Sequence, residues 1–163
     1  MYSVYQLSPT EQKRLLSIFK PRYAKTYADH VTCQFGGTNV SLPEPAERME
    51  IIGRADDNHG LVALVVRING NLKRADGKIY HITWSLDPNT SPTPDIDPRP
   101  DARYKPVHSN TLVCALVDPD GNQLIGDNNG WSFFRYEKPI LFRADPKIKY
   151  TSAELAKRNI HTL

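Results

Sequence analysis

The chain has 163 residues, of which 39% are hydrophobic and 24% are charged, and its formal net charge is +3. This length is typical of one folded domain with a buried core, expected here to span residues 1–163. No apolar run is long enough to cross a bilayer, and the first residues lack the basic start and apolar stretch of a signal peptide. We therefore expect a cytoplasmic protein without a membrane partner, which two cysteines in apolar, strand-like surroundings also favour.

A helix is predicted near the N-terminus. Ser8 is a suitable N-cap, Pro9 suits the first turn and Glu11 completes a capping box, whereas Lys20-Pro21 ends the helix. The chain then becomes rich in β-branched and aromatic residues, and strands are expected at residues 31–35, 49–55, 61–68, 79–86 and 111–117. This pattern predicts an α+β fold of mostly antiparallel strands with few helices.

Turn signals separate these strands. Asn69-Gly70 follows the third strand, and Asp118–Gly121 turns the chain after the fifth. Residues 56–60, Asp-Asp-Asn-His-Gly, indicate a hairpin loop. Two carboxylates and His59 raise the question of a metal site, but they lack a regular ligand spacing, so a polar turn is favoured and no metal is expected.

The second half of the chain begins with a proline-rich segment. Residues 88–106 contain six of the 13 prolines, so they cannot form a helix or a central strand. Such a loop is either a lid over a functional site or a plain connection. Beyond it, a strand is expected at 131–136 and a short capped helix at 151–159. Residues 135–163 are rich in Lys and Arg, which permits an anionic ligand but is more simply a solvated basic face.

Two His-x-Thr triplets, His30-Val31-Thr32 and His81-Ile82-Thr83, lie 51 residues apart, each in a predicted strand. Side chains two positions apart on a strand point to the same face, so each triplet presents an imidazole and a hydroxyl together. By the same parity Tyr80 and Trp84 face away from His81 and belong to the core. Two triplets facing each other across a cleft would provide an acid, a base and two hydroxyl groups.

These groups suit phosphodiester hydrolysis, in which protons move at both ends of the scissile bond and donors stabilise the phosphoryl oxygens. Histidine titrates near neutral pH, so a neutral and a protonated imidazole can coexist in one site. The hydroxyl groups of Thr32 and Thr83 can donate to the non-bridging oxygens. Because this chemistry requires neither a metal nor a cofactor, we expect none.

Paired His-x-Thr triplets on strands resemble the signature of the two-histidine (2H) phosphoesterase superfamily, and the resemblance spans residues 20–117. The superfamily includes cyclic phosphodiesterases, enzymes that process RNA 2′,3′-cyclic phosphates, enzymes that cleave 2′,5′-oligoadenylates and phage enzymes that destroy cyclic-nucleotide alarms. The resemblance implies a bilobal fold with two histidines facing across a central groove. It also implies that His30 and His81 share the acid and base roles, in either order, while Thr32 and Thr83 bind the phosphate.

Further residues suit a nucleotide substrate through stacking, amide or charged groups. The predicted substrate contacts are Tyr27, Tyr104, Lys105, His108, Ser109 and Asn110. For residues 104–110 the alternative is a polar entry to the strand at 111–117. Arg74 and Lys78, around a turn before the second triplet, could reach an anionic ligand, although exposed turn charge is the simpler interpretation.

The sequence thus predicts a metal-independent phosphodiesterase acting on a nucleotide or short RNA. Its substrate would be a cyclic nucleotide or oligonucleotide messenger, or a 2′,3′-cyclic phosphate at an RNA end. Two other interpretations are open: a non-catalytic nucleotide- or RNA-binding module, and a structural β-rich protein in which both histidines are satisfied within the sheet. The sequence leaves the oligomeric state open.

Overall fold

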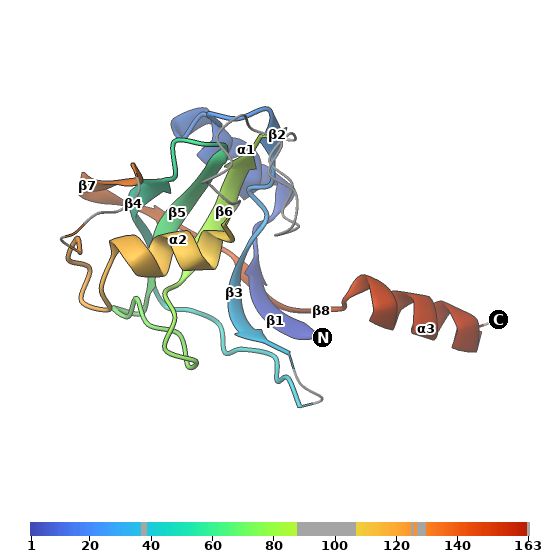
Figure 1. The fold of residues 1–163 in the computed structure, drawn as a ribbon. Coiled ribbons are helices and arrows are strands. Elements are labelled where there is room, and N and C mark those ends of the chain that lie inside the picture. The colour runs from blue at the N-terminus through green and yellow to red at the C-terminus, as the bar shows by residue number, and fades with distance from the viewer. Residues whose placement is uncertain (37–38, 88–106, 125, 127–129, 163) are drawn as a thin grey trace.

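The computed structural model describes residues 1–36, 39–87, 107–124, 126 and 130–162. Their strands form an eight-stranded sheet of order β7-β4-β5-β6-β3-β1-β8, with β2 paired to β6 (Figure 1). All the strand pairings in this part of the chain are antiparallel, so the predicted mostly antiparallel α+β fold with few helices is confirmed. The strands are β1 Tyr2–Gln6, β2 Lys25–Thr26, β3 His30–Phe35, β4 Met49–Asp56, β5 Leu61–Ile68, β6 His81–Leu86, β7 Ser132–Phe142 and β8 Asp145–Lys149. The helices are α1 Pro9–Ile18, α2 Ser109–Leu116 and α3 Ser152–Thr162.

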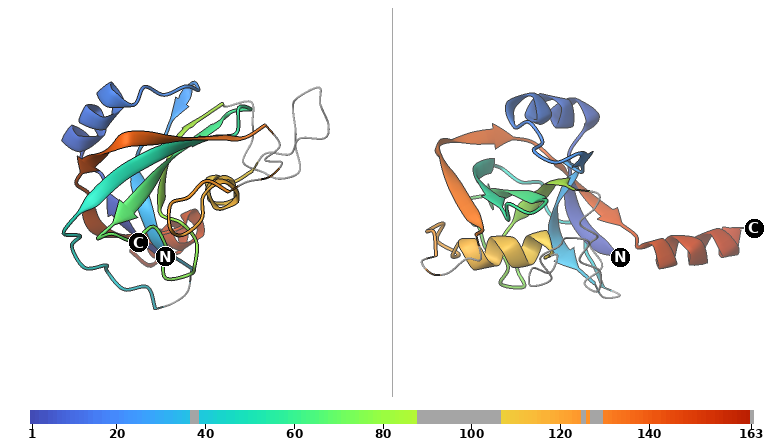
Figure 2. Two further views of the ribbon diagram at one scale, coloured as in Figure 1. Left: turned by 90° about the vertical axis from the view of Figure 1, so that its left-hand side faces the viewer. Right: turned by 45° about the horizontal axis from the view of Figure 1, so that its top comes forward.

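The sheet is covered on both faces. Alternate residues of β5 point to opposite sides, so Val62 and Leu64 join one hydrophobic cluster while Ala63 and Val65 join the other. α1 contributes Leu15 to the first cluster, and α2 packs on the second. Figure 2 shows the two helices on opposite sides of the strands. Because both faces are buried, β5 is apolar along almost its whole length.

α1 begins with the predicted N-cap and proline, but the Glu11 carboxylate bonds groups other than the Ser8 backbone N–H that a capping box would give it. The Ser8 side chain accepts a hydrogen bond from the backbone N–H of Glu11 at 3.1 Å, and Pro9 is the first helical residue. The Glu11 carboxylate accepts from Arg14 and from the backbone of Arg143, which ties the helix to the end of β7. The helix ends at Ile18, just before the predicted stop.

α2 corrects one prediction. Residues 111–117 were expected to form a strand, but residues 109–116 are helical. Leu112, Val113 and Leu116 lie on the buried side of this helix, at helical spacing. A short apolar run has no clear period, and the tertiary contacts with the sheet decide between helix and strand. This difference matters for function, because α2 brings its first turn against the second triplet.

The sheet has two parts that meet between β3 and β6. β4, β5, β6 and β7 form one part, while β1, β3 and β8 form the other. Between β3 and β6 the described pairing is a single position, Val31 opposite Ile82. Figure 1 shows β1 and β3 extending away from the β4–β6 strands beyond this junction. The two His-x-Thr triplets therefore lie at the boundary between the two parts.

The predicted turns and hairpin loop are also confirmed. The Asp57 carboxylate accepts from the backbone N–H groups of His59 and Leu61, both at 2.8 Å, which closes the loop between β4 and β5. Asn69 and Gly70 both adopt positive φ in the turn after β5. The proposed lid at 88–106 lies outside the described residues.

The C-terminal helix projects from the body of the protein (Figures 1 and 2). Thr151 and Glu154 form the predicted cap, since the hydroxyl accepts from Glu154 N and the carboxylate from Thr151 N. The ammonium group of Met1 pairs with the same carboxylate. Among the described residues, no helix has the length and apolarity needed to cross a membrane.

Candidate functional site

A cavity of about 930 Å³ lies between β3, β6, the turn at residues 74–78 and the first turn of α2. All four side chains of the two triplets line it. Its lining residues are Thr26, Tyr27, Asp29, His30, Thr32, Phe35, Arg74, Asp76, Lys78, His81, Thr83, His108, Ser109, Asn110 and Thr111.

Strand pairing brings the two triplets together. Val31 opposes Ile82 and both belong to the core on the α1 side, so the residues flanking them face the cavity. Because β3 and β6 are antiparallel, Thr32 lies toward His81 and His30 lies toward Thr83. Trp84 and Tyr80 pack on the α1 side, as their parity predicts. The triplets are therefore side by side on neighbouring strands.

His81 is held in one tautomer by the backbone. Its Nδ1 lies 2.8 Å from the carbonyl oxygen of Ile79, which can only accept, so Nδ1 carries the proton. Nε2 is then an acceptor, and it lies 3.0 Å from the Ser109 hydroxyl. The Ser109 oxygen is also 2.8 Å from the Thr83 hydroxyl, which can donate to it. The Thr83 hydroxyl thus donates to Ser109, and the Ser109 hydroxyl donates to His81 Nε2.

The surroundings of His81 keep it neutral. The side chain is 8% exposed, and burial lowers its pKa to about 4, although the bond to the Ile79 carbonyl opposes the shift. The positive charges of Arg74 and of a protonated His30 lower the pKa further. At neutral pH His81 is therefore an uncharged imidazole whose Nε2 lone pair faces the cavity.

His30 has a different partner. Its Nδ1 lies 2.9 Å from the Asp29 carboxylate, which in turn pairs with the Lys149 ammonium group from β8. Burial lowers the pKa of His30, the Asp29 carboxylate raises it, and Lys149, whose Nζ lies 3.3 Å from Nδ1, lowers it. Against the effect of burial, hydrogen bonds from Lys149, His30 and Gln6 hold the pKa of Asp29 well below its usual range. Burial has the largest effect, so the pKa of His30 lies below its usual value, while Asp29 remains a carboxylate that favours the imidazolium form.

Arg74 differs from its predicted exposure. Arg74 and Lys78 were both interpreted as exposed turn charges, and both line the cavity. Lys78 is exposed as expected, whereas Arg74 is only 6% exposed. The Asp76 carboxylate accepts two hydrogen bonds from Arg74, at 2.6 and 3.1 Å, and holds the guanidinium in place. The site therefore has a fixed positive charge close to His81.

The structure places four of the six predicted substrate contacts at the cavity: Tyr27, His108, Ser109 and Asn110. His108 is the N-cap residue of α2, and Ser109 and Asn110 are in its first turn. Tyr104 and Lys105 lie outside the described residues. Three of the four therefore enter the site from the start of a helix, whereas Tyr27 directly follows β2.

Among the residues that sequence reasoning missed at or beside the site are Asp29, Lys149 and Phe35. Asp29 directly precedes His30, and a carboxylate next to a proposed catalytic histidine is a signal that could have identified it. Lys149 and Phe35 carry no such signal. The pairing of β1 with β8 places Lys149 beside His30. An irregularity in β3 turns the Phe35 side chain toward the cavity.

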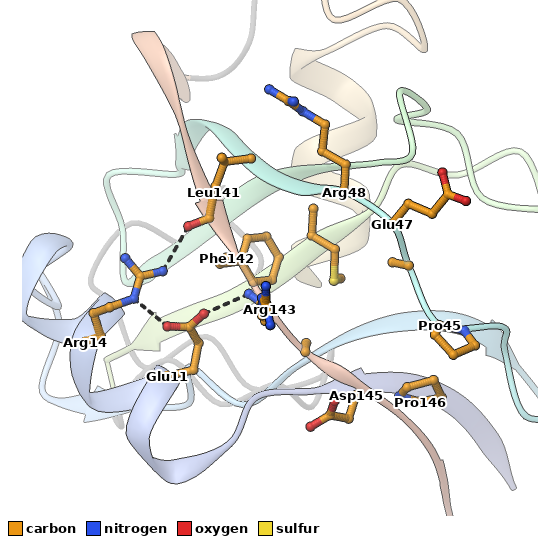
Figure 3. A pocket seen from close by; sticks show the side chains of 13 residues that line it. Glu11, Arg14, Pro45, Glu47, Arg48, Leu141, Phe142, Arg143, Asp145 and Pro146 are labelled. Atoms are coloured by element: carbon orange, nitrogen blue, oxygen red, sulfur yellow. Dashed lines mark hydrogen bonds and ion pairs between the residues drawn. The ribbon is translucent and has the colours of Figure 1, made fainter.

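Two other cavities lie apart from the triplets. One, of about 590 Å³, is lined by α1, the segment before β4 and the end of β7, where Glu11 bonds Arg14 and the backbone of Arg143 (Figure 3). The other, of about 610 Å³, lies between α1 and β7 over Trp84. Neither brings two imidazoles together.

Only the cavity at the β3–β6 junction combines two imidazoles, several hydroxyl groups and a fixed guanidinium among the described residues. The same residues contain no cluster of three or more His, Cys, Asp or Glu side chains placed to hold a metal ion. Comparisons of the chain with protein-family models, with curated proteins and with solved structures found no match.

Proposed function

We propose that this protein is a phosphodiesterase of the two-histidine type, which hydrolyses a nucleotide or short RNA substrate by acid–base catalysis without a metal. The observation that carries the proposal is that His30, Thr32, His81 and Thr83 line one cavity although the triplets are 51 residues apart in the chain. Membership of the 2H phosphoesterase superfamily, with its two-lobed fold, is part of the proposal. It is supported by the division of the sheet into two parts at the triplets.

The different partners of the two histidines assign their roles. His81 is the base, because its Nε2 lone pair already accepts a hydrogen bond from a hydroxyl group. His30 is the acid, because the Asp29 carboxylate stabilises its protonated form. For the attacking water to donate to Nε2 when the substrate is bound, the Ser109 side chain rotates away from this nitrogen.

The reaction then balances without a further reactant. His81 Nε2 removes a proton from water as the water oxygen forms a bond to phosphorus. The bond from phosphorus to the leaving oxygen breaks, and that oxygen takes the proton from His30 Nε2. Thr32 and Thr83 donate to the non-bridging oxygens, and Arg74 stabilises their developing charge. His81 then releases one proton to solvent and His30 takes one up, which restores the two histidines.

The test is a substrate panel assayed in EDTA. Purified protein is incubated with 2′,3′-cyclic, 3′,5′-cyclic and 2′,5′-linked nucleotides, and the products are identified by mass. We expect one linkage to be hydrolysed to a phosphate monoester, at a rate that EDTA leaves unchanged. Loss of turnover in EDTA would contradict the mechanism. Stable binding of a nucleotide without turnover would instead identify a non-catalytic binding module.

A second candidate function uses Ser109 as the nucleophile. Its hydroxyl is 3.0 Å from His81 Nε2, and His81 is oriented in turn by the Ile79 carbonyl, as in a nucleophile–base–orienter arrangement. Ser109 is also in the first turn of α2, where backbone N–H groups can bind an anion. This hydrolase would pass through a covalent Ser109 intermediate.

Ser109→Ala separates the two functions. For two-histidine hydrolysis we expect the variant to retain activity to within about tenfold, since it removes one hydroxyl contact. A covalent mechanism predicts loss of turnover in the variant. It also predicts a phosphorylated or acylated Ser109 peptide when the wild-type reaction is quenched and analysed by mass spectrometry.

A further inference from the structure

Phe35, the last residue of β3, is an aromatic side chain in an unusual position. It is 70% exposed, and it lines the same cavity as the triplets. Large apolar side chains that are exposed within a cavity commonly mark the place of a ligand. Phe35 has no part in the acid–base chemistry, so it requires a separate explanation.

An irregularity in β3 directs Phe35 to this face. Tyr2 pairs with Phe35 and Ser3 with Gln34, but Val4 pairs with Thr32, so β3 contains one extra residue. In a regular strand Phe35 would be three positions from Thr32 and would point to the opposite face. The bulge restores it to the face of the triplets, and bulges next to active sites commonly redirect a side chain in this way.

A second aromatic ring, that of Tyr2 on β1, packs against Phe35. The Tyr2 ring centroid lies 5.5 Å from that of Phe35 and 6.1 Å from that of His30. These tilted contacts form a row of three rings that leads from the end of β3 to the first triplet. The row positions Phe35 relative to His30 while Phe35 stays 70% exposed and lines the cavity.

Tyr27 is less suited to stacking on a ligand. The Lys25 ammonium group lies 5.0 Å from the centroid of its ring, in a cation–π arrangement that occupies one face. The exposed ring of Phe35 has no such cation within its described contacts. Phe35 is therefore the better stacking surface of the two aromatic residues that line the cavity.

We propose that Phe35 stacks on a nucleobase of the substrate, and that the substrate class is a nucleoside phosphodiester rather than a phosphodiester of a base-free alcohol. This inference rests on the proposed function, because it takes the triplets as the phosphate site. At about 3.3 Å per strand residue, Phe35 is at most roughly 10 Å along β3 from Thr32, which suits one nucleoside. The cavity is also much larger than a phosphate group requires.

The test compares two substrates in Phe35→Ala. With a nucleoside 2′,3′-cyclic phosphate, we expect KM to rise by roughly 5- to 150-fold while kcat changes little, as for loss of one stacked base. With glycerol 1,2-cyclic phosphate, which has no base, KM should not change. Phe35→Trp should restore the nucleotide KM. Equal losses on both substrates, or no change on the nucleotide, would overturn the proposal.

A control variant and a binding measurement complete the experiment. Phe134→Ala removes another exposed aromatic, on β7, that does not line the cavity, and it should leave both KM values unchanged. Calorimetric titration with 3′-AMP and 2′-AMP measures the same subsite without turnover. Binding that depends on Phe35 in a protein that hydrolyses nothing would disprove the phosphodiesterase and retain the base subsite. Binding that is equal in wild type and Phe35→Ala would disprove the subsite alone.

Discussion

The two histidines of the site stand in chemically different halves of the same sheet. His81 is on β6, in the buried half, with a backbone carbonyl at Nδ1 and the positive charge of Arg74 nearby. His30 is on β3, in the half formed with β1 and β8, with the Asp29 carboxylate at Nδ1. Burial lowers the pKa of both imidazoles, but only His30 has a carboxylate partner that opposes the shift. The environment, rather than the motif, therefore sets how readily each imidazole gains a proton.

The largest effect that would test this division is the loss of either imidazole. His30→Ala and His81→Ala should each lower kcat by about 10²- to 10⁴-fold, the usual contribution of a general acid or base. Steady-state kinetics on the substrate found in the panel measures the change. His59→Ala, in the exposed loop between β4 and β5, serves as the control and should keep wild-type activity. Full activity in either triplet variant would rule out a shared acid–base role.

The free energy of unfolding of the protein should depend on pH through His81, which is buried on β6. Its pKa is about 4 in the folded protein and near 6.5 in the unfolded chain, so between these values the unfolded chain binds more protons. The contribution of His81 to the free energy of unfolding is complete above pH 6.5 and is lost as the pH falls toward 4. The whole shift corresponds to about 3 kcal/mol. Urea unfolding at pH 7 and pH 4.5 measures it. The fall should be smaller in His81→Gln than in wild type, and equal falls would contradict the assignment.

Glycine substitutions should distinguish the packing of the two halves. A Cβ at Gly53 on β4 would lie 2.6 Å from the Phe133 ring and 2.7 Å from the Phe134 carbonyl oxygen, so Gly53→Ala should destabilise by about 1–3 kcal/mol. Gly36, just after β3, has φ of +83° and open space around it, so Gly36→Ala should cost only about 1 kcal/mol of backbone strain. Chemical denaturation of both variants measures the difference. An equal loss would show that β4 and β7 can separate to admit the methyl group.

The smallest effect is a shift in the pH profile of kcat/KM. A neutral His81 and a protonated His30 predict a bell-shaped profile with an acidic optimum, since the pKa of each is lowered. Asp29→Asn removes the carboxylate that raises the pKa of His30, so the alkaline limb should move to lower pH. Lys149→Met removes a charge that lowers it, so the same limb should move to higher pH. We expect shifts below about one pH unit, and shifts in the same direction would contradict the assignment of His30 as the acid.

Much of the fold could be predicted from local pattern. Ser8, Pro9 and Glu11 start α1 because a cap needs only neighbouring residues, and the apolar run of Leu61–Ile68 is a strand because it is buried on both faces. Residues 111–117 were predicted as a strand because a short apolar run fits both periods, but Ser109–Leu116 is helical. Contact with the sheet, which no local pattern contains, makes it a helix.

In the site, too, some features could be predicted from local pattern and others depended on tertiary contacts. Parity along each strand was enough to place His30 with Thr32 and His81 with Thr83, because backbone geometry alternates side chains whatever the rest of the chain does. Two features needed contacts between residues far apart in the sequence: the approach of Lys149 to Asp29, and the bulge that turns Phe35 toward the cavity. The burial of Arg74 near His81 also had no local signal. Local strand geometry, readable from the chain, places the reactive groups on a shared face. Their charge states depend on the fold, because pKa values depend on burial and on neighbours brought by other strands.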